Sequence, residues 1–378
     1  MPTRPASRRV LLVSDDPRWR EAAASAASHV GLELHPAGSA AEAMLVLAGC
    51  HDVCRLLLGA NVPETHAAAL LEMTCGEAGS GVDVLLLGGA MPDMHSVPEP
   101  ELLVEALAGQ DSACDHGAAE APLAAEHVRR LMDEGCVRVR FQPIVRLRDR
   151  SVIALEVLAR LHRTHGAILP PNCFVPQLEQ AGLGAELLRH VVREAFSVLR
   201  ELDGATLALN LPLDVLRDRR TAGMLSELCR QAEFPAFRIL LELTETQVVN
   251  DVAVLDHAVA RLREAGYVLA IDDAGPDVPQ HRAMFGLPFN WVKLDKSVVA
   301  RAAASRVGRR YMADLIASAH RENLSVIAEG VEHQDTWDMA GELGADCVQG
   351  YMVARPLPAE VVPVWRAAWE AGVQQPPG

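Results

Sequence analysis

The sequence predicts an α/β protein in two parts, a doubly wound parallel-sheet domain followed by a TIM-like β/α barrel. Short apolar runs alternate with helical stretches through most of the 378 residues, which is the pattern of parallel sheets with crossover helices. The alternation stops over GQDSACDHGAAEAPLAAE, which divides the chain. Eight strand-like runs then follow in about 240 residues, as one barrel requires.

The first part alternates strands and helices in βαβ order. Strands are predicted at RRVLLVS, LELHPA, CRLLLGA and VDVLLLGGA, with helices from Trp19 to about Val30 and from Ala40 to Leu47. This order predicts a doubly wound sheet over residues 1–110. Residues 111–126 are predicted to be a linker, and the barrel is predicted to span residues 127–372.

The predicted strands of the barrel lie at 137–145, 152–161, 206–210, 239–244, 268–272, 291–294, 325–329 and 347–350. Helical stretches separate most of them, for example 185–201, 251–265, 308–321 and 335–343. Strands and helices in this order and at this spacing predict a single β/α barrel.

Acidic and amide residues stand at or just after the ends of these apolar runs, namely Glu156, Asn210, Glu242, Asp272, Asp273, Glu329 and Glu332. The active site of a β/α barrel is built at the carboxyl ends of its strands. A single Glu in such a place is more often a helix cap or a solvated loop residue. Five or more carboxylates in one mouth repel one another, however, and a bound cation relieves that cost. The mixed oxygen donors favour Mg²⁺ or Mn²⁺ over zinc.

Lysine is almost absent from the chain, because the only two are Lys293 and Lys296 in WVKLDKS. Lys293 falls at a strand end among the acidic residues. A compact ammonium there can orient a water molecule or stabilise developing phosphate charge. The alternative interpretation is a plain ion pair with a neighbouring carboxylate.

Composition excludes several classes of function. The net charge of −15 argues against a broad DNA- or RNA-binding surface, because phosphate backbones require clustered Lys and Arg. No stretch approaches the ~20 apolar residues of a membrane span, and the first apolar run is too short for a signal peptide. The eight Cys are scattered without a CxxC pair, which favours free thiols and a cytoplasmic location.

The second part resembles the EAL-domain cyclic-di-GMP phosphodiesterases over about residues 127–370. The motifs occur in family order: FQPIVRLRDRSVIALEVLAR with EVL in place of EAL, FVPQLEQAGL, LALNLP, LELTET, IDDAG, VKLDKS, IAEGVE and VQGY. The resemblance implies hydrolysis of cyclic-di-GMP to linear pGpG by two metal ions, Mg²⁺ or Mn²⁺, in a homodimer.

The resemblance also implies a role for each matching residue. Six of them would hold the two metal ions: Glu156, Asn210, Glu242, Asp272, Asp273 and Glu329. Asp272 would bridge the two ions. Lys293 would position the attacking water, Glu329 would also serve as a base, and Glu332 would brace Lys293. Further contacts are implied for four residues, with Gln142, Arg160 and Gln349 beside the substrate and Glu245 anchoring the loop after strand five.

One loop departs from the family pattern. The family's DDFGTGYSS is DDAGPDVPQ here, with Ala274 in place of Phe and two Pro in place of Thr and Ser. Two prolines and the loss of the second Gly predict a stiffer loop of different shape. Two functional hypotheses therefore stay open: a phosphodiesterase, favoured by the complete ligand set, and an effector that binds cyclic-di-GMP with negligible turnover.

The first part resembles a response-regulator receiver domain, more weakly. VLLVSDDP matches its first strand and acidic pair, Asp15 and Asp16. The phosphorylated Asp is replaced by Gly59, the Ser or Thr of the switch by Gly88, and no Lys occurs in this region. The resemblance therefore implies a degenerate receiver that docks a protein partner or dimerises. The alternative is that the acidic pair merely caps the first helix of a generic flavodoxin-like fold.

Overall fold

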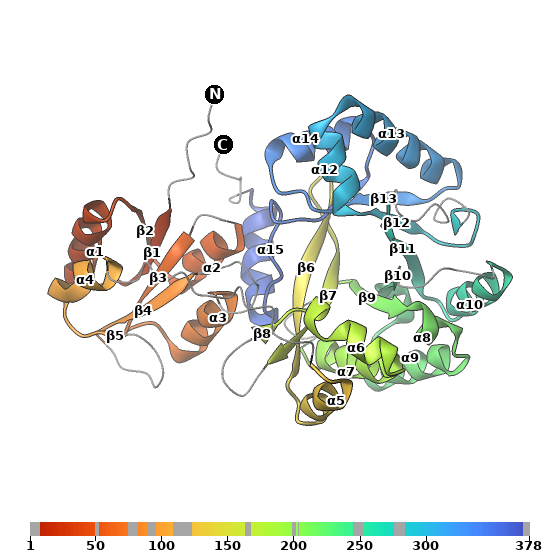
Figure 1. Cartoon of the computed structure of the whole chain (residues 1–378), viewed down its shortest axis with the longest axis horizontal. Helices are drawn as coiled ribbons and strands as arrows, with labels where there is room; N and C mark the ends of the chain where they lie inside the picture. Colours follow the sequence, from red (N-terminus) through yellow and green to blue (C-terminus); the bar gives the residue numbers. More distant parts are fainter. Residues whose placement is uncertain are drawn as a thin grey trace. The chain divides into compact units, whose positions relative to one another are not determined.

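The computed structural model describes residues 8–49, 53–74, 82–88, 96–108, 123–162, 168–198, 202, 204–244, 252–275 and 284–372. The chain divides into two compact units, one built on strands β1 to β5 and the other on the strands from β6 onward (Figure 1). Each unit is described separately. None of the described helices is long and apolar enough to cross a membrane.

The first unit is a parallel sheet in the order β2-β1-β3-β4-β5. Its strands are β1 (Arg9–Val13), β2 (Glu33–Ala37), β3 (Val53–Gly59), β4 (Asp83–Leu87) and β5 (Ser96–Val97). Its helices are α1 (Pro17–His29), α2 (Ala40–Gly49), α3 (Glu64–Thr74), η1 (Pro100–Leu102) and α4 (Leu103–Ala108). Helices α1 and α4 lie together on one face, and α2 and α3 on the other (Figure 1). This order confirms the predicted doubly wound fold, which flavodoxin and receiver domains share.

The second unit is a closed barrel of eight strands. They are β6 (Val137–Arg146), β7 (Val152–His162), β9 (Leu207–Pro212), β10 (Ile239–Thr244), β11 (Val268–Ala274), β12 (Trp291–Leu294), β13 (Ser325–Ala328) and β14 (Cys347–Val348). The ring closes because β6 pairs with both β7 and β14. All eight strands overlap the predicted ones, and the barrel prediction is confirmed.

Strand β6 runs against the expected direction. It is antiparallel to β7 and β14, whereas the other neighbouring strands of the ring are parallel. The cause is local, because the connection between β6 and β7 is too short to contain a crossover helix and therefore forms a hairpin. As a result, Gln142 lies directly opposite Glu156.

Helices surround the barrel (Figure 1). The helices and the remaining short elements are α5 (Ala125–Asp133), β8 (Ile168–Leu169), η2 (Pro171–Cys173), α6 (Val175–Gln180), α7 (Gly184–Ser197), α8 (Leu213–Arg217), α9 (Arg220–Gln231), η4 (Ala236–Arg238), α10 (Val252–Glu264), α12 (Lys296–Ala304), α13 (Arg306–Arg321), α14 (Gln334–Glu342), η5 (Ala359–Val361) and α15 (Val362–Glu370). The inside of the barrel is filled by a layer of buried residues: Ile144, Ala154, Ala208, Leu240, Ala270, Ile327 and Cys347. Trp291 packs against this layer.

Candidate active site

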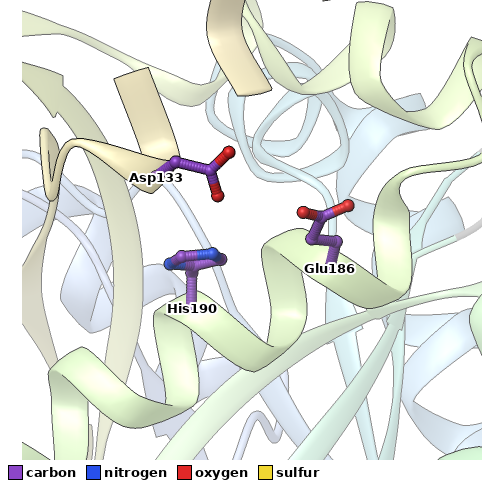
Figure 2. A group of neighbouring side chains, drawn as sticks. All are labelled: Asp133, Glu186 and His190. Carbon is purple, nitrogen blue, oxygen red and sulfur yellow. The ribbon is translucent and has the colours of Figure 1, made fainter. Parts of the chain in front are cut away.

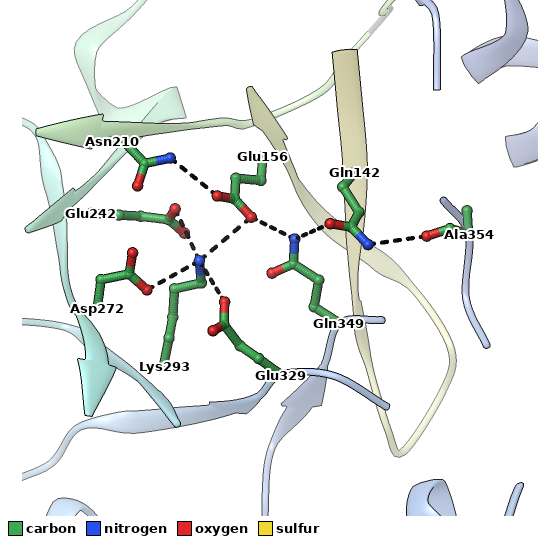
Figure 3. A network of polar contacts seen from close by, with 9 residues as sticks. All are labelled: Gln142, Glu156, Asn210, Glu242, Asp272, Lys293, Glu329, Gln349 and Ala354. Atoms are coloured by element: carbon green, nitrogen blue, oxygen red, sulfur yellow. Dashed lines mark hydrogen bonds and ion pairs between the residues drawn. The ribbon is translucent and has the colours of Figure 1, made fainter. Parts of the chain in front are cut away.

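The candidate site is the next layer of side chains along the barrel axis. Because strand side chains repeat every two residues on one face, the residue two positions from each member of the apolar layer, and from Trp291 beside it, also points inward. These residues are Gln142, Glu156, Asn210, Glu242, Asp272, Lys293, Glu329 and Gln349. Every strand of the barrel thus supplies one polar residue, either within the strand or just after its end. Figure 3 shows all eight directed into one space.

The ammonium group of Lys293 lies among four carboxylates. Its Nζ is 2.7 Å from Glu329 Oε1, 3.1 Å from Glu242 Oε2, 3.3 Å from Asp272 Oδ1 and 3.5 Å from Glu156 Oε2. The Lys293 side chain is only 1% exposed. The plain ion pair considered from the sequence is therefore replaced by a cluster in which one positive charge faces four acidic groups.

Glu156 is held from both sides by amide groups. Asn210 Nδ2 donates to Glu156 Oε1 at 3.1 Å, and Gln349 Nε2 donates to Glu156 Oε2 at 2.6 Å. Gln349 also donates to Gln142 Oε1 at 3.3 Å, and Gln142 donates to the Ala354 carbonyl at 3.2 Å (Figure 3). These donors fix the Glu156 carboxylate in its ionised form. Burial opposes that charge, but Lys293 and the two amides lower the pKa of Glu156 below its usual value.

The other carboxylates titrate at higher pH than usual. Burial, reinforced by Asp272 and Glu156, raises the pKa of Glu329 to about 8. Burial and the neighbouring Asp272 raise the pKa of Asp273 to about 6. The pKa of Glu242 lies well above its usual value, because this carboxyl is fully buried among other acids. The cluster therefore carries more potential negative charge than Lys293 balances, which is the condition under which a cation binds.

A local distortion of β11 brings a fifth carboxylate group, that of Asp273, beside this cluster. The pairing of β11 with β12 shifts register between Ile271 and Ala274, and Asp273 has a φ of 52°. A bulge and a left-handed residue other than Gly are uncommon and concentrate at active sites. Their effect here is that carboxylate oxygens of Asp272, Asp273 and Glu329 all lie within 4.8 Å of one another.

The donor set fits divalent metal ions. Carboxylate and amide oxygens are the ligands of Mg²⁺ and Mn²⁺. Two buried oxygens directed into the layer, Glu242 Oε1 and Gln349 Oε1, have no hydrogen-bond partner among the described residues. A cation would supply the missing partner, whereas a buried acceptor without one costs free energy.

The remaining predicted residues are placed differently. Arg160 lies on β7, four residues beyond Glu156 on the same face of the strand, and its side chain is buried. Glu332 is exposed, and the four ion pairs that Lys293 makes in the described part of the chain go to other carboxylates. The structure therefore does not bring Glu332 to Lys293 as predicted. Between Glu329 and Glu332, Gly330 has a φ of 68° and Val331 is fully buried.

Two other parts of the prediction cannot be located. Glu245 and residues 276–283 of the unusual loop lie outside the described residues. Ala274, which precedes that loop, is the last residue of β11 and is fully buried.

Among the described residues of the first unit, no comparable cluster lies at the corresponding edge of the sheet. Asp16 accepts a hydrogen bond from Arg18 N at 2.9 Å and caps α1, as the alternative interpretation expected. Asp15 accepts a hydrogen bond from Asn61. A Cβ atom added to Gly59 would lie 2.6 Å from Asn61 Oδ1, so the position of the missing phosphoacceptor has no space for a side chain without a shift of its neighbours.

Comparison with known proteins supports the same family for the barrel. The model of the EAL domain family matches residues 125–356. A cyclic di-GMP phosphodiesterase of Pseudomonas aeruginosa, RocR, is 30% identical over 246 residues, which are 64% of this chain and 62% of that protein. The alignment thus spans less than two thirds of that relative's length.

Solved structures share the fold. A complex of the PaMucR phosphodiesterase with c-di-GMP has a TM-score of 0.59 at 24% identity and covers 63% of this chain and 99% of that one. The EAL domain of FimX from Pseudomonas aeruginosa, bound to c-di-GMP, has a TM-score of 0.57 at 23% identity and covers 62% of this chain and 96% of that one. Because the family model covers more than half of the sequence, this chain belongs to the EAL-domain family.

Proposed function

We propose that the barrel is a metal-dependent phosphodiesterase that hydrolyses cyclic-di-GMP to linear pGpG. The observation that carries the proposal is the Lys293 cluster, in which one ammonium faces four carboxylates inside the barrel. The family and the activity named for the similar RocR protein support this substrate.

Six residues would hold two ions, Mg²⁺ or Mn²⁺: Glu156, Asn210, Glu242, Asp272, Asp273 and Glu329. When bound, the ions would supply the Lewis acidity that activates a water molecule and stabilises charge on the phosphate. The bulge at Asp273 supports this assignment, because it places two successive carboxylates of β11 beside Glu329.

Residues of the chain itself would orient the water, accept its proton and bind the substrate phosphate. Lys293 would orient the attacking water, because its ammonium is fixed by charge on several sides. Glu329 would accept the proton, because its carboxylate lies 2.7 Å from the Lys293 ammonium that would orient the water. Arg160 would bind a phosphate oxygen, and the linked pair Gln142 and Gln349 would keep Glu156 in place.

A second candidate function is a cyclic-di-GMP effector with negligible turnover. The observation that favours it is the DDAGPDVPQ sequence, in which Ala274 and two prolines replace the family's residues beside the paired Asp. In this case the pseudo-receiver, which we propose spans residues 1–110, would pass the signal to a protein partner or a second copy of the chain. The boundaries proposed from the sequence, a linker at 111–126 and a barrel at 127–372, apply to both functions.

The test is chromatographic. Purified full-length chain is incubated with cyclic-di-GMP and Mn²⁺ or Mg²⁺, and pGpG is followed over time. We expect conversion by the wild type and by Glu322→Ala, an exposed acidic control on the same unit, and none by Glu156→Ala or after chelation. Binding without conversion in the wild type would reject the enzyme in favour of the effector.

A further inference from the structure

A second group of metal-binding side chains lies outside the barrel mouth, between two helices. Asp133 is the last residue of α5, and Glu186 and His190 lie four residues apart on α7. Residues at that spacing share one face of a helix. One ligand atom from each of the three side chains lies within 4.8 Å of the others. Figure 2 shows the three side chains turned toward one space between the helices.

Acidic and basic side chains share the carboxyl end of α5. Asp133 ends the helix and Glu134 follows as its C-cap, where the helix macrodipole is negative, and Arg130 in the last turn balances part of this charge. Arg129 pairs with Glu186 at 3.4 Å through one oxygen. The observation that points to a bound cation is therefore the geometry of Asp133, Glu186 and His190.

We propose that Asp133, Glu186 and His190 form a zinc site that fastens α5 to α7. Carboxylate oxygens and imidazole nitrogens are both ligands of Zn²⁺, and a water molecule can take the fourth position. Bonds of about 2.0–2.2 Å to a tetrahedral ion separate its ligands by about 3.3–3.6 Å. The ligand atoms lie within 4.8 Å of one another, so exposed or half-buried side chains need to close at most about 1.2–1.5 Å by small rotations.

The site differs chemically from the barrel layer. The barrel layer offers only oxygen ligands and the Lys293 ammonium, whereas His190 supplies a nitrogen ligand. Zn²⁺ and Cu²⁺ bind imidazole nitrogen more readily than Mg²⁺ does. The ion would fix the position of α5, the first described helix after residues 109–122. This inference does not rest on the proposed hydrolysis.

The experiment measures Zn²⁺ binding to the metal-stripped full chain by equilibrium dialysis, with excess Mg²⁺ to occupy the oxygen sites. We expect one more Zn²⁺ bound by the wild type than by His190→Ala, or a loss of affinity of at least ~10- to 100-fold. Asp133→Asn should weaken binding similarly and, because Asp133 is exposed, should leave folding intact. His127→Ala is the matched control, since His127 is exposed on the same helix.

Spectroscopy provides a second readout. Cu²⁺ added to the wild type should show an imidazole nitrogen in its electron paramagnetic resonance spectrum, and this signal should persist in His127→Ala and disappear in His190→Ala. Equal Zn²⁺ stoichiometry and affinity in the wild type, His190→Ala and Asp133→Asn would overturn the proposal.

Discussion

The two units use the same construction and treat charge in opposite ways. Both are wholly or mainly parallel sheets flanked by helices, a class in which ligands bind at the carboxyl ends of the strands. In the barrel, these ends carry buried carboxylates around Lys293. In the first unit, glycines stand at the two corresponding switch positions, Gly59 and Gly88. The buried charge described in the first unit, Arg55, has its partner in Asp83, whereas the excess of buried carboxylates, which is costly to fold, lies in the barrel, where we propose that a cation binds.

Replacing Lys293, the positively charged side chain at the centre of the cluster, should have the largest effect on stability. Lys293→Met leaves four buried or partly buried carboxylates without their shared partner, so we expect a loss of about 3–5 kcal/mol in the free energy of unfolding. Mn²⁺ should restore part of this stability while hydrolysis stays abolished. Denaturant unfolding with and without Mn²⁺ measures the effect. An unchanged stability would show that the cluster is not the charged unit described here.

Introducing an Asp at position 59 should not make the first unit a substrate for phosphorylation. Gly59→Asp places a Cβ 2.6 Å from Asn61 Oδ1, the end of a side chain that can turn away, and 3.0 Å from the Val13 backbone carbonyl, and overpacking of this kind costs about 1 kcal/mol. We expect reduced stability and no phosphorylation by acetyl phosphate, measured by unfolding and by mass spectrometry. Gly49→Asp is the control, because nothing lies within 4 Å of its added Cβ. Phosphorylation of the Gly59→Asp chain would show that the first unit can still form a functional charged site at the ends of its strands.

The pH dependence of stability separates the units further. The folded barrel holds protons on Asp273 up to a pKa of about 6 and on Glu329 up to a pKa of about 8. Unfolded carboxyls have pKa values of about 4, so this stabilisation is complete below about pH 4 and is lost as the pH rises through the folded values.

The metal-free chain should therefore lose stability from about pH 5 to pH 8, and the stabilisation by Mn²⁺ should grow over the same range because the ion replaces these protons. Thermal unfolding with and without Mn²⁺ measures both trends. A shift by Mn²⁺ that is constant across this range would contradict the raised pKa values.

The smallest expected effect concerns the acidic pair of the first unit. Asp16→Ala removes the side-chain cap of α1, which is worth about 1 kcal/mol. We expect a lower unfolding midpoint and unchanged cyclic-di-GMP turnover. Loss of turnover in this variant would show that the acidic pair does more than cap a helix.

Much of the fold and of the barrel layer could be predicted from the sequence. The strands are apolar runs, and a polar residue lies two positions from the apolar residue that fills the barrel, as at Ala154 and Glu156 or Leu240 and Glu242. This period of two is visible without a structure. The amides Gln142 and Gln349 are 207 positions apart, and only the ring closure by β6 brings them together.

The features that escaped prediction depend on three-dimensional placement. The direction of β6 follows from its hairpin with β7, and the positive φ of Asp273 follows from the bulge in β11. Glu332 is exposed although its neighbour Val331 is fully buried, so its place three residues after Glu329 does not bring it into the barrel. The group of Asp133 with Glu186 and His190 joins residues from two helices that no motif connects.

The central claim is that the charged layer of the barrel performs turnover and does not only bind nucleotide. Single-turnover kinetics test it most directly, with metal-stripped full chain in excess over cyclic-di-GMP and the reaction started by Mn²⁺. The account predicts that bound nucleotide converts to pGpG only after Mn²⁺ is added, and that the Glu156→Ala chain converts none. Cyclic-di-GMP that stays bound and intact in the wild-type chain after Mn²⁺ addition would contradict it.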